Sequence, residues 1–144
     1  MKLKPRKRTK ARELALALLF QDHFQEEPPL EEALALLQDD SLSPEVKEKA
    51  LEIHRGVKER EKKLEEIIDS YSKWRKERID LVDRAILKLA LYEMLHDNTV
   101  PPAVAINEAV ELAKKFSSGK AYKFINGLLD RVKKEQLEDG HDPS

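Results

Sequence analysis

Basic side chains crowd the first twelve positions of the chain. Seven Lys or Arg residues and no acidic residue occur there, namely Lys2, Lys4, Arg6, Lys7, Arg8, Lys10 and Arg12. Clustered cations of this kind bind the phosphates of a nucleic acid and gain affinity by releasing its counterions. A basic segment that is only solvated is the alternative interpretation.

The remaining residues carry the opposite net charge. The chain has 27 basic and 28 acidic residues, so positions 13–144 hold 20 basic against 28 acidic residues, a net charge of −8. This segregation predicts a polyanionic partner at the basic segment and allows a cationic partner elsewhere on the surface.

A second group of candidate binding residues lies near position 120. It combines cationic, aromatic and amide side chains at the expected start of a helix, namely Lys120, Tyr122, Lys123, Phe124 and Asn126. Cations and the N–H groups of a helix start can meet phosphate, while aromatic rings can stack on bases. Phe124 is also a typical core residue, so the pattern alone leaves its role open.

Residues suited to catalysis are scarce. The chain has no Cys, which excludes disulfides, thiolate metal sites and cysteine nucleophiles. The four His residues are scattered, and no glycine-rich phosphate loop is present. We therefore expect a protein that is not an enzyme and needs no cofactor or metal.

No run of the chain approaches the roughly 18 consecutive apolar residues of a membrane span. The basic N-terminus also lacks the small-residue cleavage site of a signal peptide. Together with the absence of Cys, these features predict a cytoplasmic protein that does not associate with membranes.

The elements that must position these residues all have the helical period. Apolar residues recur at three- and four-residue spacing, and strand patterns are missing. We expect about seven helices, with Gly56 as a kink in the longest. The first begins between residues 5 and 9 and ends near 25, and the others that the pattern delimits span 30–37, 44–72, 80–95, 103–116 and 120 or 121 to 134. Ser43 and Asp80 are the expected caps of two helix starts, and the helix 80–95 is apolar enough to be central.

Three segments of the chain resemble the NusB family of bacterial transcription antitermination factors. They are residues 100–116 (VPPAVAINEAVELAKKF) with 123–130 (KFINGLLD), residues 83–93 (DRAILKLALYE), and the first helix with Arg8, residues 11–13 (ARE), Ala15, Leu18 and Phe20. The resemblance covers nearly the whole chain, in the right order.

The resemblance implies an all-α fold of two small helical bundles packed together. We expect a single domain over 1–144, with an N-terminal helical subdomain of about 1–75, a C-terminal helical subdomain of about 76–137 and a frayed tail at 138–144.

The resemblance also implies a function. NusB proteins pair with the small-subunit ribosomal protein NusE, bind the boxA element of nascent ribosomal RNA, and join other Nus factors on RNA polymerase to suppress termination. The positions expected to contact RNA are Lys4, Arg6, Lys7, Arg8, Lys10, Arg12, Lys120, Lys123, Phe124 and Asn126. The positions expected to contact the protein partner are Phe20, Glu77 and Asp83.

Some positions depart from the family pattern. Thr9 interrupts a run that is often arginine in relatives, and Lys120 stands where an acid can occur. Ser117 and Ser118 replace a glycine-containing helix end, so the geometry of that turn is open.

Two other functions remain as alternatives. A NusB-like region also recruits RNA in some ribosomal RNA methyltransferases, but that reading needs a cofactor-binding domain and a nucleophilic Cys, and this chain has no Cys. A purely structural protein-interaction bundle is the second alternative. A homodimer is a further option, since it would cover the basic segment.

Overall fold

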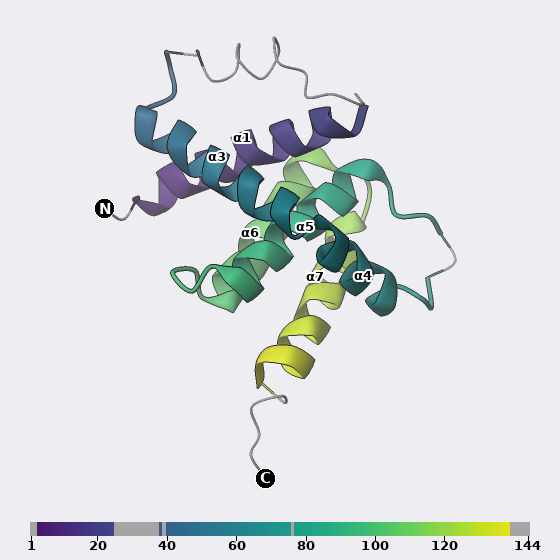
Figure 1. Ribbon diagram of the computed structural model, residues 1–144. Helices are drawn as coiled ribbons and strands as arrows, with labels where there is room; N and C mark the ends of the chain where they lie inside the picture. The colour runs from purple at the N-terminus through teal and green to yellow at the C-terminus, as the bar shows by residue number, and fades with distance from the viewer. Residues whose placement is uncertain (1–2, 25–37, 39, 76, 139–144) are drawn as a thin grey trace. The chain divides into compact units, whose positions relative to one another are not determined.

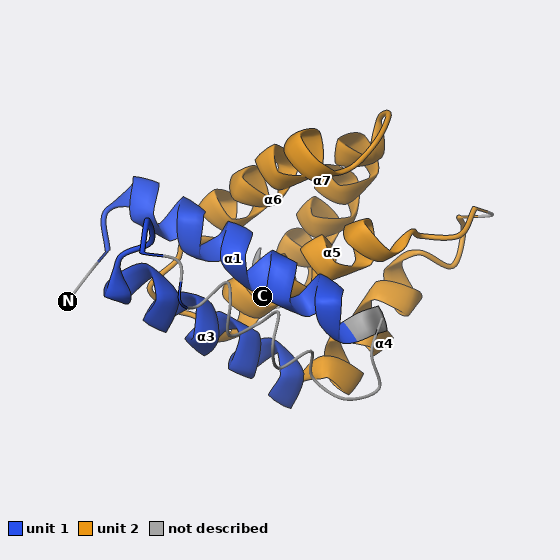
Figure 2. Cartoon of the chain, turned by 90° about the horizontal axis from the view of Figure 1, so that it is seen from above, with its two compact units in different colours: residues 1–59 blue, residues 60–144 orange. Residues whose placement is uncertain are grey.

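The computed structural model describes residues 3–24, 38, 40–75 and 77–138 (Figure 1). Within these ranges all regular structure is helical, with six α-helices and one π-helical segment. The helix predicted at 30–37 and the end of the chain after 138 lie outside the described residues. The chain divides into two compact units, residues 1–59 and 60–144 (Figure 2).

The first unit contains α1 (Pro5–Phe24) and α3 (Pro44–Glu59), which pack against each other. Two side-chain contacts between them show that the helices run in the same direction. Lys7 Nζ lies 2.9 Å from Glu45 Oε2 near both starts, and His54 Nε2 lies 2.6 Å from Asp22 Oδ2 nearer both ends. The predicted apolar stripe is confirmed, because the buried side chains include Ala11, Leu14, Ala15, Leu18 and Leu19 of α1 and Val46, Ala50, Ile53 and Val57 of α3.

The second unit contains α4 (Glu61–Tyr71), α5 (Leu81–His96), α6 (Pro102–Phe116), α7 (Ala121–Val132) and the π-helical segment η1 (Lys133–Glu138). The helix α5 contacts α4, α6 and α7. Its side chains are buried all around the helix, including Ile86, Leu87, Leu89 and Leu91. The prediction of a central helix is therefore confirmed.

The single long helix predicted over 44–72 is wrong, because α3 ends at Glu59 and α4 begins at Glu61. The interruption falls at Arg60, whose backbone angles (φ −116°, ψ 13°) are not helical, and not at Gly56. The two helices serve different cores, since α3 packs on α1 and α4 packs on α5. Ion pairs fix α4 on α5, with Lys88 Nζ 2.9 Å from Glu61 Oε2 and Arg84 Nη1 2.6 Å from Glu65 Oε1.

Both predicted helix caps are present. The Ser43 hydroxyl oxygen accepts the backbone N–H of Val46 at 3.3 Å, and the Asp80 carboxylate accepts the backbone N–H of Asp83 at 3.5 Å. These bonds satisfy donors that the first turn of a helix leaves without a backbone partner.

The turn from α6 to α7 depends on one glycine. Gly119 has φ +59°, in the left-handed region that side chains with a Cβ rarely adopt. Two residues later, Ala121 donates its backbone N–H to the carbonyl of Ser118 at 3.3 Å. The start of α7, with Lys120 and Lys123, is placed by this turn.

Candidate nucleic-acid interface

The basic segment forms the N-terminal half of α1 in the first unit. Arg6 and Lys10 stand four residues apart, so they share one face of the helix, and both are exposed. Lys4, just before the helix, is exposed as well, and its carbonyl accepts the backbone N–H of Arg8 at 3.0 Å. The helix thus holds cations one turn apart on a surface that a phosphate backbone can follow.

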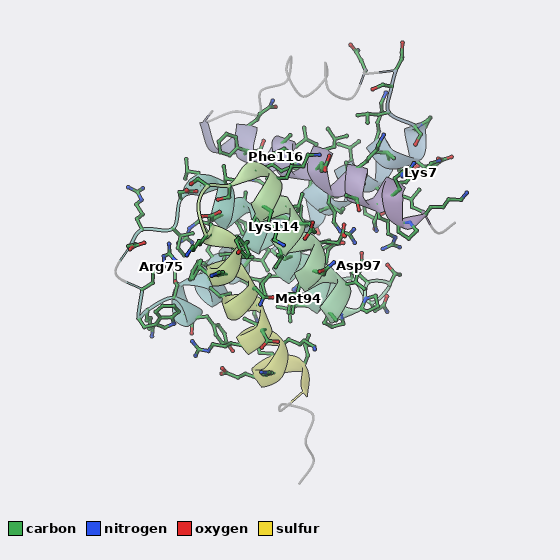
Figure 3. The ribbon with its side chains drawn as sticks, turned by 180° about the vertical axis from the view of Figure 1, so that it is seen from behind. Lys7, Arg75, Met94, Asp97, Lys114 and Phe116 are labelled. Carbon is green, nitrogen blue, oxygen red and sulfur yellow. The ribbon has the colours of Figure 1, made fainter. Side chains whose placement is uncertain are left out.

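Lys7 and Thr9 are engaged within the first unit. The ammonium group of Lys7 donates to Glu45 at 2.9 Å (Lys7 is labelled in Figure 3), and this hydrogen bond together with the positive charge lowers the pKa of Glu45. The hydroxyl of Thr9 donates to the carbonyl of Pro5 at 3.1 Å. Lys7 thus shares its charge with Glu45, whereas Arg6 and Lys10 face solvent.

Arg12 differs from the rest of the basic segment, since only 3% of its surface is exposed. A side chain this buried cannot contact the phosphates of an RNA bound at the protein surface, whereas Arg6 and Lys10 can. Phe20 lies two turns further along the same helix and is half-buried.

The second group of predicted RNA residues lies on the first two turns of α7, in the second unit. Lys120, Lys123 and Asn126 are exposed, whereas Phe124 is half-buried. The sequence left the role of Phe124 open between core and surface, and in the structure Ile125 takes the fully buried position beside Leu128 and Leu129. The predicted group therefore has two faces, one with cations and an amide and one with the Phe124 ring.

The Phe124 ring meets residues from the connection between α4 and α5 that the sequence analysis did not single out. The guanidinium carbon of Arg75 lies 4.0 Å from the ring centroid, and the Trp74 ring meets it edge-on at 6.2 Å (Arg75 is labelled in Figure 3). Trp74 is 64% exposed and is the only Trp of the chain. A single Trp between Lys73 and Arg75 in a polar connection was the sequence signal for an aromatic and basic surface.

Glu77 adjoins this cluster through Arg75. The Arg75 Nε group donates to the Glu77 carbonyl at 3.2 Å, and its Nη2 atom lies 3.6 Å from the Glu77 carboxylate. The Glu77 carboxylate is otherwise open to solvent, with 85% of its side chain exposed. The guanidinium group of Arg75 therefore contacts both Phe124, predicted to bind RNA, and Glu77, predicted to bind the protein partner.

Asp83 is buried, with 4% of its surface exposed. The Ser117 hydroxyl donates to its Oδ1 atom at 2.5 Å, which ties the start of α5 to the end of α6. Burial raises the pKa of the Asp83 carboxyl, and the bond from Ser117 opposes this effect. Ser117, which departs from the family pattern, thus links the end of α6 to the start of α5.

A groove lies between α6 and α7 and has a volume of about 430 Å³. Ala103, Ile106 and Val110 form its apolar part. Its polar part consists of Asn107 on α6 and Tyr122, Lys123 and Asn126 on α7. Tyr122, Lys123 and Asn126 belong to the candidate group near position 120, whereas Asn107 is not among the candidate residues of the sequence.

Two classes of site are not found in the described ranges. No group of three or more His, Cys, Asp or Glu side chains there is placed to hold a metal ion. None of the helices described combines the length and the apolar character that crossing a membrane requires.

Residues 9–134 match the model of the NusB family. The transcription antitermination protein NusB of Acetivibrio thermocellus is 40% identical over 131 residues, which cover 90% of each chain. The transcription antitermination protein NusB of Bacillus subtilis is 39% identical over 130 residues, which cover 90% of this chain and 96% of the relative.

Solved structures agree with this match. NusB of T. maritima superposes with a TM-score of 0.76 at 34% identity, covering 94% of both chains. A crystal structure of the antitermination factors NusB and NusE in complex with double-stranded RNA contains a chain that matches with a TM-score of 0.78 at 25% identity, covering 91% of this chain and 98% of that one.

The helical fold, the basic start of α1 and the mixed surface of α7 place this protein among small all-helical proteins with a candidate surface for RNA. The chain belongs to the NusB family. The resemblance inferred from residues 83–93, 100–116 and 123–130 is thereby confirmed.

Proposed function

We propose that this protein is an RNA-binding transcription antitermination factor of the cytoplasm. It acts with the small-subunit ribosomal protein NusE on the boxA element of nascent ribosomal RNA and helps RNA polymerase to read through terminators. Its family membership supports this function, as does the similarity to a NusB chain crystallised with NusE and double-stranded RNA. The curated relatives are also close to this chain in length.

The observation that carries the proposal is the exposed basic face of α1. Arg6 and Lys10 stand one turn apart and face solvent, and Lys4 precedes them. Phosphate contacts of this kind position an RNA strand and supply salt-dependent affinity, while contacts to bases supply sequence preference. In the second unit, Lys123, Asn126 and the cluster around Phe124 are suited to the bases.

The predicted site residues fall into two groups by exposure. Residues that are not buried contact the partners directly, with Arg6, Lys10 and Lys123 on RNA and with Glu77 and the half-buried Phe20 on the ribosomal protein. Arg12 and Asp83 are buried and act as positioning residues for α1 and for the junction of α5 with α6. Substituting a buried charged residue would disturb folding as well as binding, so surface residues make the better test.

The test is a titration of fluorescently labelled boxA RNA with this protein, in the presence and in the absence of NusE. The variant is Arg6→Glu/Lys10→Glu, and the control is Lys62→Glu/Lys63→Glu, which reverses two exposed lysines of α4. We expect the α1 variant to lose RNA binding at moderate salt while the control binds as the wild type does.

Two outcomes would contradict the proposal. Equal binding by the α1 variant and the wild type would show that the basic face is only solvated. The absence of any RNA-dependent signal, with or without NusE, would favour a purely structural interaction bundle. Far-ultraviolet circular dichroism of each variant shows whether helicity is unchanged.

A further inference from the structure

We propose that the groove between α6 and α7 receives one unpaired base of the bound RNA strand. This inference rests on the proposed function and extends it, because it assigns a base-binding role to Asn107, Tyr122 and the apolar part of the groove. The basic face of α1 engages the sugar-phosphate backbone, whereas this groove has the chemistry to hold a base.

The size and position of the groove suit a planar group that enters from solvent. Its volume of about 430 Å³ falls within the range of roughly 300–1,000 Å³ that is typical of small-molecule sites. On α6 the lining residues Ala103, Ile106, Asn107 and Val110 stand at three- and four-residue spacing, so they form one continuous helix face. Tyr122, Lys123 and Asn126 likewise lie on one face of α7.

The apolar part of the groove offers a surface for the face of a base. Ile106 is 8% exposed and is the most buried of the lining residues, while Val110 and Tyr122 are half-buried and Ala103 is exposed. The ammonium group of Lys114 lies 5.2 Å from the centroid of the Tyr122 ring and helps to hold that ring in place (Lys114 is labelled on α6 in Figure 3).

The polar part of the groove offers hydrogen bonds to the edge of a base. Asn107 and Asn126 approach it from opposite helices, and within the described part of the chain neither amide group has a hydrogen-bond partner. An amide presents two donors and an acceptor, so it can pair with the Watson–Crick or Hoogsteen edge of a base. Proteins read single-stranded RNA by combining such hydrogen bonds to the base edge with stacking on a planar side chain, which Tyr122 can supply here.

The charge of the groove favours a nucleotide over a protein side chain. Lys123 lines the groove, and none of the lining residues is acidic. Lys114 lies beside it, with Glu111 as its neighbour at 3.5 Å, and Lys120 is exposed one turn before Lys123. A basic ribosomal protein would be repelled here, whereas the phosphate of the inserted nucleotide can meet Lys123.

The test is an abasic scan of boxA RNA with the complex of this protein and NusE. Each RNA lacks a single base, and its affinity is compared with that of the complete RNA. With the wild-type protein we expect one position at which losing the base weakens binding by about fivefold or more, the size typical of a well-made base contact.

Two variants alter the groove without touching the residues already assigned to RNA. Ala103→Phe fills the groove with a ring, and Asn107→Ala removes one amide. We expect both to weaken binding of the complete RNA by about the same factor as that abasic position, and to make binding insensitive to the missing base. The matched control is Val104→Phe, since Val104 is 45% exposed on the same helix and does not line the groove.

The outcomes separate this inference from the proposed function. If both groove variants keep the wild-type affinity and the wild-type abasic profile, while Arg6→Glu/Lys10→Glu loses binding, the groove does not hold a base and the proposed function stands. If the groove variants lose NusE but keep the abasic profile, the groove is a protein-docking site and the inference is overturned. If the wild-type complex binds no RNA, both fail together.

Discussion

The guanidinium carbon of Arg75 lies 4.0 Å from the centroid of the Phe124 ring, so one face of this ring is covered within the protein itself. Trp74 meets the same ring edge-on at 6.2 Å, and the backbone carbonyl of Glu77 accepts a hydrogen bond from Arg75. A base that stacks on Phe124 must therefore use its other face or displace Arg75. Displacing Arg75 would break its contacts with Glu77, the residue proposed to contact the ribosomal protein.

Replacing Phe124 tests this cluster. Phe124→Leu keeps an apolar side chain but removes the aromatic ring, and we expect a loss of RNA affinity of about 1–3 kcal/mol if one base stacks there. Phe124→Tyr retains the ring and should bind as the wild type does. Because Trp74 is the only Trp and lies beside Phe124, its fluorescence should change when RNA binds to the protein alone. Equal affinities for Leu and Tyr variants would remove Phe124 from the interface.

The bond between Ser117 and Asp83 predicts a stability that depends on pH. Burial raises the pKa of Asp83, so the folded protein retains this proton to a higher pH than the unfolded chain. The contribution of this carboxyl to stability is thus largest below its ordinary pKa and falls as the pH rises through its pKa in the folded protein. Ser117 limits this fall by donating to the ionised form.

Ser117→Ala should therefore cost about 1–3 kcal/mol in the free energy of unfolding at pH 7, and clearly less at about pH 3.5, below the ordinary pKa of an aspartate, where the raised pKa keeps the carboxyl mostly protonated. Urea unfolding at the two pH values measures this difference. The control is the same substitution in an Asp83→Asn background, where the effect should lose its pH dependence. An equal cost of Ser117→Ala at both pH values in the wild-type background would contradict this account.

Two glycines near the predicted RNA surface should respond to substitution in opposite directions. Gly119→Ala forces a Cβ into a backbone at φ +59° and should destabilise the protein by about 1–2 kcal/mol. Gly127→Ala meets no atom within 4 Å and should stabilise α7 by about 0.5–1 kcal/mol. Thermal unfolding of both variants measures the effects. A stabilising Gly119→Ala would refute the role given to this turn.

Much of the architecture follows from local rules that a sequence displays. The apolar period placed α5 and α6 within a residue or two of their observed bounds, and α1 starts within the interval predicted for it. Ser43 and Asp80 cap the helices expected of them. The interruption at Arg60 was not predicted, because the apolar seam runs on from Val57 to Leu64 without a break. The interruption becomes apparent only in the structure, where α3 packs on α1 and α4 packs on α5.

The sequence could predict which residue types make up the candidate site, but not how their side chains are arranged in space. Charge density indicated the start of α1, yet it could not separate the exposed Arg6 and Lys10 from the buried Arg12, because burial depends on the tertiary fold. The groove residues Asn107 and Tyr122 and the cluster of Trp74 and Arg75 come together through packing of distant segments. A linear pattern does not contain these contacts.

The central claim, that the exposed basic face of α1 binds the RNA backbone, is tested most directly by the salt dependence of boxA binding with NusE present. The slope of log K against log salt should become shallower by about 0.7 for each phosphate contact that Arg6→Glu/Lys10→Glu removes, whereas Lys62→Glu/Lys63→Glu should keep the wild-type slope. An α1 variant with the affinity and slope of the wild type would contradict the account.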